Sequence, residues 1–219
     1  MLDEIQNLAL NLSSYVVAAE GNISARDSNG FLIKSSGTKL SDVTKSNCAI
    51  CDFNGNVLNN LVPSMEYTFH AWIYKNFPNI NFIAHTHPTH TLKILCSDLT
   101  EEFSDIRLFP DQIVYNSSKS CVVDYFMPGR PLKDGIKKAV KDFVSEKNFF
   151  PNLILLKNHG IICAGETATQ CEYATHICEK SAEIFFATVN IKRNYLNRMN
   201  IEEIINDKNE KYRKTLCQK

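Results

Sequence analysis

The stretch that most constrains this chain is a short apolar run that ends in two histidines, residues 82–88, FIAHTHP. An apolar run of this length, bounded by proline, is typical of a buried strand. Successive strand side chains point to opposite faces, so His85 and His87 emerge on the same face, about 7 Å apart. Two imidazoles at that separation can converge on one metal ion. Pro88 suits the start of a helix expected over 91–96. The pattern therefore predicts the floor of an active site, and two ordinary strand histidines are the alternative.

The length and charge balance of the chain argue against several classes of protein. A chain of 219 residues can bury a substantial core, and its 24 basic and 24 acidic residues balance. A balanced charge lacks the electrostatic footprint of a nucleic-acid-binding protein. The first residues, MLDEI, are acidic where a signal peptide would be basic, and no apolar run approaches the length of a membrane span. We therefore expect a soluble, cytoplasmic protein without a nucleic-acid or membrane partner.

The eight cysteines do not resemble a disulfide framework. Most lie among apolar residues, as small core side chains do in a reducing compartment. This group comprises Cys48, Cys96, Cys163, Cys171 and Cys178. Cys48 and Cys51 form a C-x-x-C pair, but the pair lies in a strand-like run and has no second pair. A structural role is therefore favoured over zinc binding or redox chemistry.

Hydrophobic spacing and turn residues predict the order of helices and strands. The expected helices cover 2–19, 64–77, 132–147 and a long segment from a cap at Glu166 or Thr167 to about Asn190, followed by a polar closing helix. The expected strands form two hairpins, 23–26 with 31–34 and 48–53 with 57–58, and two later apolar strands, 153–156 and 161–164. Residues 97–131 are expected to be rich in loops. Strands first, then alternating helices and strands, indicate a single layered α/β domain.

A third histidine lies at a turn between two of these strands. His159 stands between Asn158 and Gly160, two residue types that tolerate positive φ, so its ring is presented at a turn tip. A lone histidine there would be an ordinary solvated side chain. Together with His85 and His87, it makes a three-histidine set with an open position, the arrangement of a catalytic zinc. We interpret the remaining candidates as packing or supporting groups: His70, His90 and His176.

A carboxylate begins the helix before the histidine strand. Ser64 is a plausible N-cap, and Glu66 in the first turn would interact favourably with the helix dipole. Beside a Lewis-acidic metal, the same carboxylate could transfer a proton, most usefully with its pKa raised by partial burial. Two small, polar clusters, residues 21–24 and 35–38, could each form an anion-binding nest, although most such clusters are only turns.

Several motifs occur together and in one order: GNISAR, GFLIKSSGT, PSME followed by a histidine, HTH, DYFMPG and NHGIICAGET. From about residue 3 to 190 this succession resembles the class II aldolase/adducin family. That group includes fuculose- and rhamnulose-phosphate aldolases, ribulose-phosphate 4-epimerase, a methylthioribulose-phosphate dehydratase and the head domain of adducin.

The resemblance implies a single α/β/α domain over 1–219, with a central mixed, largely antiparallel sheet and a C-terminal helical extension at 190–219. It implies Zn²⁺ held by His85, His87 and His159, although three imidazoles accept other divalent transition metals. It also implies active sites at the subunit interfaces of a cyclic homotetramer.

In the same resemblance Glu66 matches the family's acid/base glutamate, which can approach the metal when substrate is absent. The positions that bind phosphate in the sugar-phosphate aldolases correspond to Asn22, Ser36, Gly37 and Ser64. The chain departs from the family at Met65, where those aldolases often have a second serine. The family's catalytic tyrosine has no secure counterpart: Tyr115 and Tyr125 are the nearest candidates, and Tyr195 and Tyr212 are the candidates for the C-terminal tyrosine of some members.

The expected function is that of a zinc-dependent class II aldolase, catalysing reversible aldol cleavage of a small ketose or ketose phosphate through a metal-stabilised enediolate. Glu66 would move the proton at the adjacent carbon. A dehydratase, decarboxylase or 4-epimerase remains an alternative, although the epimerase typically has aspartate in place of Glu66. A non-catalytic adducin-like module would keep the fold without the metal, and the three histidines and Glu66 argue against it. The closing segment, 191–219, would pack on a neighbouring subunit or over the site.

Overall fold

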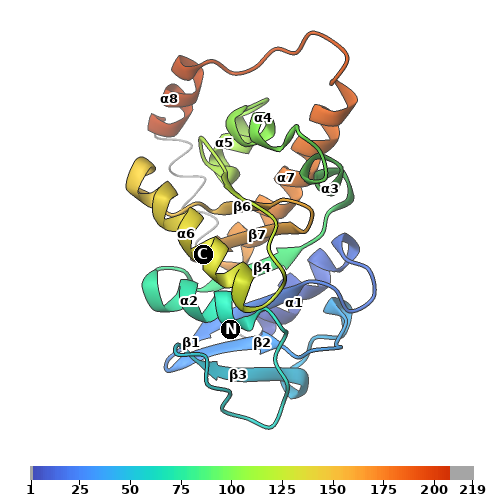
Figure 1. Ribbon diagram of the computed structural model, residues 1–219, viewed down its shortest axis with the longest axis vertical. Helices are drawn as coiled ribbons and strands as arrows, with labels where there is room; N and C mark the ends of the chain where they lie inside the picture. Colours follow the sequence, from blue (N-terminus) through green and yellow to red (C-terminus); the bar gives the residue numbers. More distant parts are fainter. Residues whose placement is uncertain (1, 208–219) are drawn as a thin grey trace.

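The seven strands in the part of the chain that the structure describes lie in one mixed sheet, in the order β3-β2-β1-β4-β7-β6-β5 (Figure 1). The computed structural model describes residues 2–207. Every neighbouring pair of strands is antiparallel except β5 and β6, which are parallel. The predicted fold class, a layered α/β fold with a largely antiparallel sheet, is therefore confirmed.

The strands are β1 (Asn22–Asp27), β2 (Gly30–Lys34), β3 (Cys48–Asp52), β4 (Phe82–Thr86), β5 (Cys121–Val123), β6 (Leu153–Leu156) and β7 (Gly160–Gly165). The helices are α1 (Leu2–Leu12), α2 (Tyr67–Asn76), α3 (Thr89–Leu95), α4 (Thr100–Asp105), α5 (Pro110–Asn116), α6 (Arg130–Lys147), α7 (Ala168–Ala187) and α8 (Arg198–Asn206). Short 3₁₀ turns cover Ser13–Tyr15, Leu40–Asp42 and Lys45–Asn47.

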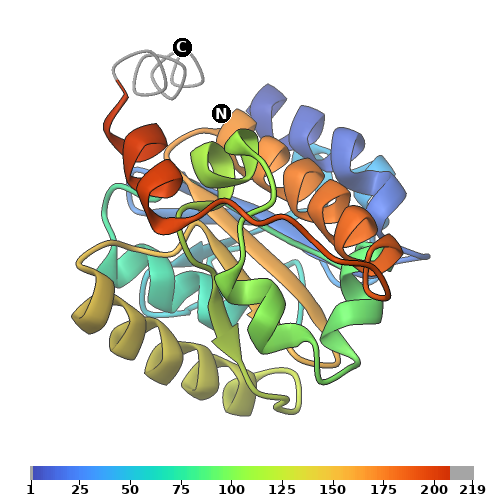
Figure 2. The same cartoon turned by 90° about the horizontal axis from the view of Figure 1, so that it is seen from above.

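Helices cover both faces of the sheet, as Figure 2 shows, with α1 and α7 on one side and α2 and α6 on the other. Each face has its own apolar core. On the first, side chains such as Ile5 of α1 and Phe185 of α7 pack on the sheet, and on the second Phe69 of α2 and Ile136 of α6 do so. The central strands β4, β6 and β7 are buried along their whole length because both of their faces are covered.

Two predicted helices are shorter in the structure than the sequence suggested. The first ends at Leu12 rather than at residue 19: a 3₁₀ turn, Ser13–Tyr15, follows, and the backbone is extended at Val16. The second begins at Tyr67 rather than at residue 64. Ser64 is therefore not its N-cap, and the Ser64 N–H instead bonds the carbonyl of Lys34.

The region expected to be rich in loops, 97–131, is so only in part. It contains α4, α5 and the three-residue strand β5, which forms by pairing with β6. Such short segments depend on tertiary contacts more than on local pattern. The second predicted hairpin is also reduced, since only Val57 forms a bridge, to Cys51. Cys96 is exposed rather than buried, whereas the other four cysteines of the predicted core group are buried.

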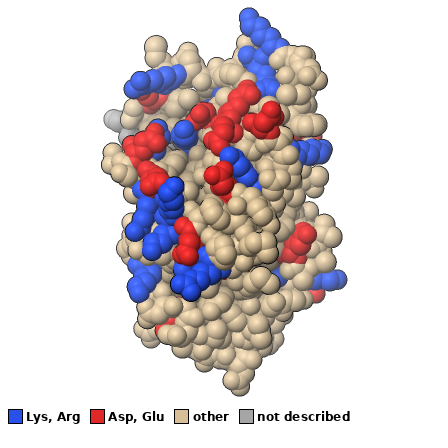
Figure 3. All heavy atoms as spheres, viewed as in Figure 1, with Lys and Arg blue, Asp and Glu red and all other residues tan. Residues whose placement is uncertain are grey.

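Other boundaries agree closely with the sequence. The predicted strand 153–156 is β6, and α7 is capped by Thr167, whose side chain accepts from the N–H of Gln170. The closing helix is present as α8, and residues 208–219 of the predicted extension, 190–219, lie outside the described residues. No helix among residues 2–207 is long and apolar enough to cross a bilayer. Charges of both signs mix on the face seen in Figure 3, without a large patch of one sign.

Candidate metal centre and active site

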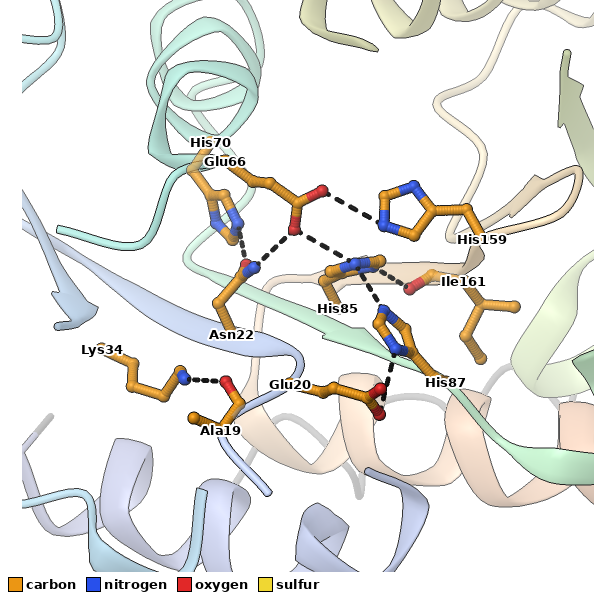
Figure 4. A network of polar contacts seen from close by, with 10 residues as sticks. All are labelled: Ala19, Glu20, Asn22, Lys34, Glu66, His70, His85, His87, His159 and Ile161. Atoms are coloured by element: carbon orange, nitrogen blue, oxygen red, sulfur yellow. Dashed lines mark hydrogen bonds and ion pairs between the residues drawn. The ribbon is translucent and has the colours of Figure 1, made fainter. Parts of the chain in front are cut away.

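The candidate site lies at the middle of the sheet, where β1, β4 and β7 run side by side. His85 is the penultimate residue of β4 and faces Asn22 across the β1–β4 pair. His87 follows directly after β4, and His159 lies in the turn that joins β6 to β7. Segments far apart in the chain thus bring three imidazoles together, as Figure 4 shows.

The three rings converge on one point. Their ligand nitrogens all lie within 4.8 Å of one another, and the Nε2 atoms of His85 and His87 are 3.1 Å apart. Tetrahedral zinc with Zn–N distances of 2.0–2.1 Å would separate two ligand nitrogens by about 3.3 Å. The donor set and its spacing therefore fit a divalent transition metal.

The turn that carries His159 is shaped for this close approach. Asn158 has a φ of +56°, as its position at a turn tip suggested. A Cβ added to Gly160 would lie 2.5 Å from Cδ2 of His87, so a side chain there would push the ligand ring away. Gly160 is thus required by the packing of the neighbouring histidine.

Partners behind two of the rings orient them. Nδ1 of His85 donates to the Ile161 carbonyl at 2.9 Å, so the neutral ring keeps its proton on Nδ1 and turns its Nε2 towards the centre. Nδ1 of His87 lies 3.4 Å from Oε2 of Glu20, which favours the same tautomer. Metal-binding histidines commonly have such a second partner, which fixes the ring.

Glu66 faces the same point from the start of α2. Its Oε2 lies 3.2 Å from Nε2 of His85, and its Oε1 lies 3.2 Å from Nε2 of His159. Oε1 is buried and makes no hydrogen bond within residues 2–207. An unsatisfied carboxylate oxygen beside imidazole nitrogens is what a cation site presents before the cation binds.

The pKa of Glu66 is shifted in the direction opposite to the prediction. Burial alone would raise this pKa, but the charge and hydrogen bonding of His85, the charge of His159 and the Asn22 amide together hold it well below its usual range. The expectation of a raised pKa was therefore wrong for this structure. Glu66 is therefore an ionised carboxylate in this structure.

The histidines respond to the same crowding. Burial, and then repulsion from His85, lowers the pKa of His159 to about 4. The pKa of His87 is also lowered to about 4, by burial and by repulsion from both His85 and His159. Burial also opposes charge on His85, yet Glu66 raises its pKa overall. His87 and His159 are thus held neutral, which is the form that binds a metal.

A buried chain of hydrogen bonds supports Glu66 from behind. The Asn22 amide donates to Glu66 Oε2 at 2.9 Å, and Asn22 Oδ1 lies 2.5 Å from Nε2 of His70. Nδ1 of His70 lies 2.7 Å from the Ser24 hydroxyl, which is 2.7 Å from that of Tyr74.

These contacts allow one consistent set of donors. Burial, reinforced by repulsion from His85, lowers the pKa of His70 to about 3, so its ring is neutral and carries one proton. Asn22 uses its NH₂ group on Glu66, so its oxygen accepts from Nε2–H of His70. Nδ1 of His70 then accepts from Ser24, whose oxygen accepts from Tyr74. This series of hydrogen bonds ends at the Asn22 amide, whose N–H donates to Glu66.

The positions predicted to bind phosphate form two groups. The Asn22 side chain is buried and engaged by Glu66 and His70. Ser36 and Gly37 are exposed, and the Ser36 N–H bonds the carbonyl of Val62, close to Ser64 in the chain. The structure therefore brings the Ser36–Gly37 turn beside the segment that leads to Ser64 and Glu66.

Of the remaining sequence candidates, His70 alone joins the network of the site. His90 contacts Glu179, and His176 contacts Tyr15. The Tyr115 ring packs on that of Tyr173, Tyr125 is exposed and Tyr195 bonds Glu102, while Tyr212 lies outside the described residues.

Sequence reasoning missed Glu20 and Lys34. Lys34 is buried at the end of β2, and its Nζ donates to the carbonyls of Ala19 at 2.8 Å and Thr38 at 2.6 Å. It thereby links the segment just before the cluster at 21–24 to the cluster at 35–38. A charged residue that ends the apolar run FLI was the available signal, whereas no pattern marked Glu20.

Comparison with known proteins gives a consistent result. The family model for the class II aldolase and adducin N-terminal domain matches residues 6–186. An L-fuculose phosphate aldolase of Methanococcus maripaludis is 30% identical over 179 residues, covering 81% of this chain and 91% of the relative. A 3-oxo-tetronate 4-phosphate decarboxylase of Haemophilus influenzae is 28% identical over 193 residues, covering 88% and 89%.

Solved structures share the fold. YgbL of Klebsiella pneumoniae superposes with a TM-score of 0.80 at 24% identity, covering 92% of this chain and 96% of its own. An L-fuculose 1-phosphate aldolase superposes with a TM-score of 0.78 at 22% identity, covering 96% and 95%. At these identities the likeness concerns the fold.

Proposed function

We propose that this chain, which belongs to the class II aldolase and adducin N-terminal domain family, is a zinc-dependent lyase that cleaves a small ketose or ketose phosphate by a reversible aldol reaction. One observation carries the proposal. The imidazoles of His85, His87 and His159 converge with the ionised Glu66 carboxylate on a single point. A non-catalytic module would have no use for that convergence.

The ligand set and the base would divide the chemistry between them. A divalent ion held by His85, His87 and His159 would polarise the oxygens of the substrate as a Lewis acid. Three histidines with an open position are the ligands of catalytic zinc, although other divalent transition metals suit the same set. The tautomer set by Ile161 and the contact with Glu20 keep His85 and His87 aimed at that position.

Aldol cleavage breaks the bond between the carbon next to a carbonyl and the carbon that bears a hydroxyl group. The hydroxyl loses its proton and becomes the aldehyde of one product, and the electron pair stays on the other carbon, which then takes up a proton. In the reverse reaction that carbon must lose the proton, and ionised Glu66 is the base available to accept it. In the cleavage direction Glu66 would first take up the proton that the hydroxyl group loses and would then deliver a proton to that carbon, so that it ends ionised as it began.

A phosphate group of the substrate would lie at the Ser36–Gly37 turn and Ser64. Both relatives named above act on phosphorylated compounds, as their names state. Lys34, buried beneath the turn, adds positive charge nearby. Met65, 69% exposed, offers no hydroxyl where a second serine was expected, so phosphate would be held by fewer groups. Asn22 would contribute mainly by holding Glu66.

A decarboxylase is the second candidate, and the similarity to the Haemophilus influenzae decarboxylase over 88% of this chain favours it. Loss of CO₂ from a 3-oxo acid breaks a carbon–carbon bond in the same position relative to the carbonyl. The electron pair again stays on the carbon next to the carbonyl, and Glu66 again handles the proton. The two reactions differ in what leaves, an aldehyde or CO₂, and in the source of the proton, which in decarboxylation comes from solvent because the leaving carboxylate carries none.

The test compares the wild-type protein with variants on both substrate classes. Purified, zinc-loaded protein is incubated with ketoses, ketose phosphates and a 3-oxo-tetronate 4-phosphate, and aldehyde and CO₂ release are measured. We expect Glu66→Gln to abolish turnover while zinc stays bound, and His87→Ala to lose both. His90→Ala, a histidine outside the site, should change neither. Turnover retained in Glu66→Gln would remove Glu66 from the mechanism.

We also propose that residues 1–219 form one domain with a C-terminal helical extension, and that the protein is a cytoplasmic homotetramer with active sites at its interfaces. The family match over 6–186 and the buried free thiols support this. Tyr125, Phe126 and Met127 are exposed apolar side chains in one loop, suited to contact another subunit. Light scattering on the purified protein measures the mass of the assembly.

A further inference from the structure

We propose that Glu20 is a positioning residue for His87 and that it strengthens metal binding at the three-histidine site, an inference that rests on the proposed function. The Glu20 carboxylate lies 3.4 Å from Nδ1 of His87, on the side of the ring opposite to the metal-facing Nε2 (Figure 4). A carboxylate behind a ligand imidazole keeps the proton on Nδ1 and makes Nε2 a better ligand.

An exposed carboxylate would ordinarily contribute little. The Glu20 side chain is 47% exposed, and contacts of this kind between mobile surface groups are usually weak. The contribution therefore depends on whether the protein holds Glu20 in place. Its own loop does so in part, because Oε2 accepts from the N–H of Val17 at 3.0 Å and the Glu20 N–H bonds the Val17 carbonyl at 3.1 Å.

The loop, residues 15–21, is itself fastened to the site at three points. The Tyr15 carbonyl accepts from the N–H of His87 at 3.1 Å. The Ala19 carbonyl accepts from the buried Nζ of Lys34 at 2.8 Å. Gly21 lies so close to β4 that an added Cβ would be 2.7 Å from the carbonyl oxygen of His85. The loop is therefore fixed to the backbone at both His85 and His87, the ligand that Glu20 contacts.

The backbone of this loop is strained in a way that places Glu20. Ala18 has a φ of +53° and Gly21 a φ of +64°. A left-handed conformation at alanine costs roughly 1 kcal/mol and persists only where the surroundings enforce it. Residues in such conformations gather at functional sites.

The geometry also separates this role from two others. A direct metal ligand would have to face Nε2 of His87, whereas Glu20 faces Nδ1. A group that transfers a proton to substrate would have to reach the side occupied by Glu66, whereas Glu66 and Glu20 lie at opposite ends of the network, with histidine rings between them (Figure 4). Glu20 thus acts through His87.

The experiment measures zinc affinity of the metal-free protein by competition with a chelator of known affinity. Glu20→Ala should weaken zinc binding by about 10- to 100-fold, the usual effect of removing such a partner. Glu20→Gln should lose less, because its amide oxygen can still accept from Nδ1–H without carrying charge. Glu183→Gln removes a charge from the exposed face of α7 and should bind zinc like the wild type.

The outcomes separate this inference from the proposed function. A wild-type protein that binds no zinc contradicts the proposed function itself. If the wild type binds zinc and Glu20→Ala binds it within twofold as tightly, or Glu183→Gln loses as much, the role of Glu20 is refuted and the proposed function stands. Circular dichroism checks folding. Should Glu20→Ala fold poorly, Glu20→Gln decides, and zinc affinity equal to that of the wild type overturns the inference.

Discussion

Replacing Ser24 by alanine tests whether the buried chain behind Glu66 runs in the direction assigned to it. The Ser24 hydroxyl is the middle member of this chain, donating to Nδ1 of His70 and accepting from Tyr74. All three residues are at most 1% exposed, so no water replaces a lost partner. The substitution removes one oxygen atom and leaves two buried polar groups without their bonds.

The expected loss can be estimated from those two groups. A buried polar group left unsatisfied costs about 1–3 kcal/mol. His70 Nδ1 would have no alternative donor in this chain of contacts, whereas Tyr74 keeps a long contact of 3.5 Å to the Asn81 carbonyl. Ser24→Ala should therefore lower the free energy of unfolding by about 2–4 kcal/mol. Urea unfolding of the metal-free protein, followed by circular dichroism, measures this change.

Tyr74→Phe is the matched control. It removes only the terminal donor, and Ser24 still donates to His70, so a smaller loss of about 1 kcal/mol is expected. With Ser24 absent, the proton of His70 is free to move to Nδ1, which would turn the oxygen of Asn22 towards Glu66. Turnover should thus fall in Ser24→Ala more than in Tyr74→Phe. A stability within about 0.5 kcal/mol of the wild type, the usual range of a surface substitution, or a larger loss in Tyr74→Phe, would refute the assigned direction.

Two further predictions concern the same region. Gly21→Ala should lower both stability and zinc affinity, because its Cβ would lie 2.7 Å from the His85 carbonyl at a φ of +64°; unchanged zinc binding by chelator competition would contradict this. In the metal-free protein the pKa of His70 is lowered from 6.5 to about 3, so between these values the unfolded chain binds more protons and stability falls as the pH falls. His70 should contribute up to about 1.4 kcal/mol per pH unit in that window. His70→Gln should show a shallower decline in urea unfolding from pH 6.5 to 4.5, and equal slopes would argue against a buried, neutral His70.

The local chemistry of the candidate site was predictable where one short pattern carried it. The run FIAHT alternates its side chains as a strand must, so the shared face of His85 and His87 followed from period alone. The turn at Asn158–Gly160 between two apolar runs was equally local. The boundary of β6 agreed with its apolar run because strand propensity and burial point to the same residues.

Prediction failed where the outcome depended on distant partners. Ser64 has the residue type of a helix cap, yet its N–H pairs with Lys34 and the helix begins later. The strand β5 has three residues and exists because β6 offers it an edge. The pKa of Glu66 was expected to rise with burial, and it falls because imidazoles and the Asn22 amide meet the carboxylate in the folded state.

The amino-acid sequence by itself determined which chemical groups this protein has: three imidazoles, one carboxylate and the glycines that let them approach. Only the tertiary structure decided which groups meet, because strand register placed Asn22 opposite His85 and packing of α2 brought Glu66 and His70 to them. Distances, protonation states and supporting partners such as Glu20 belong to the folded chain, since burial and charge act through space and not along the sequence.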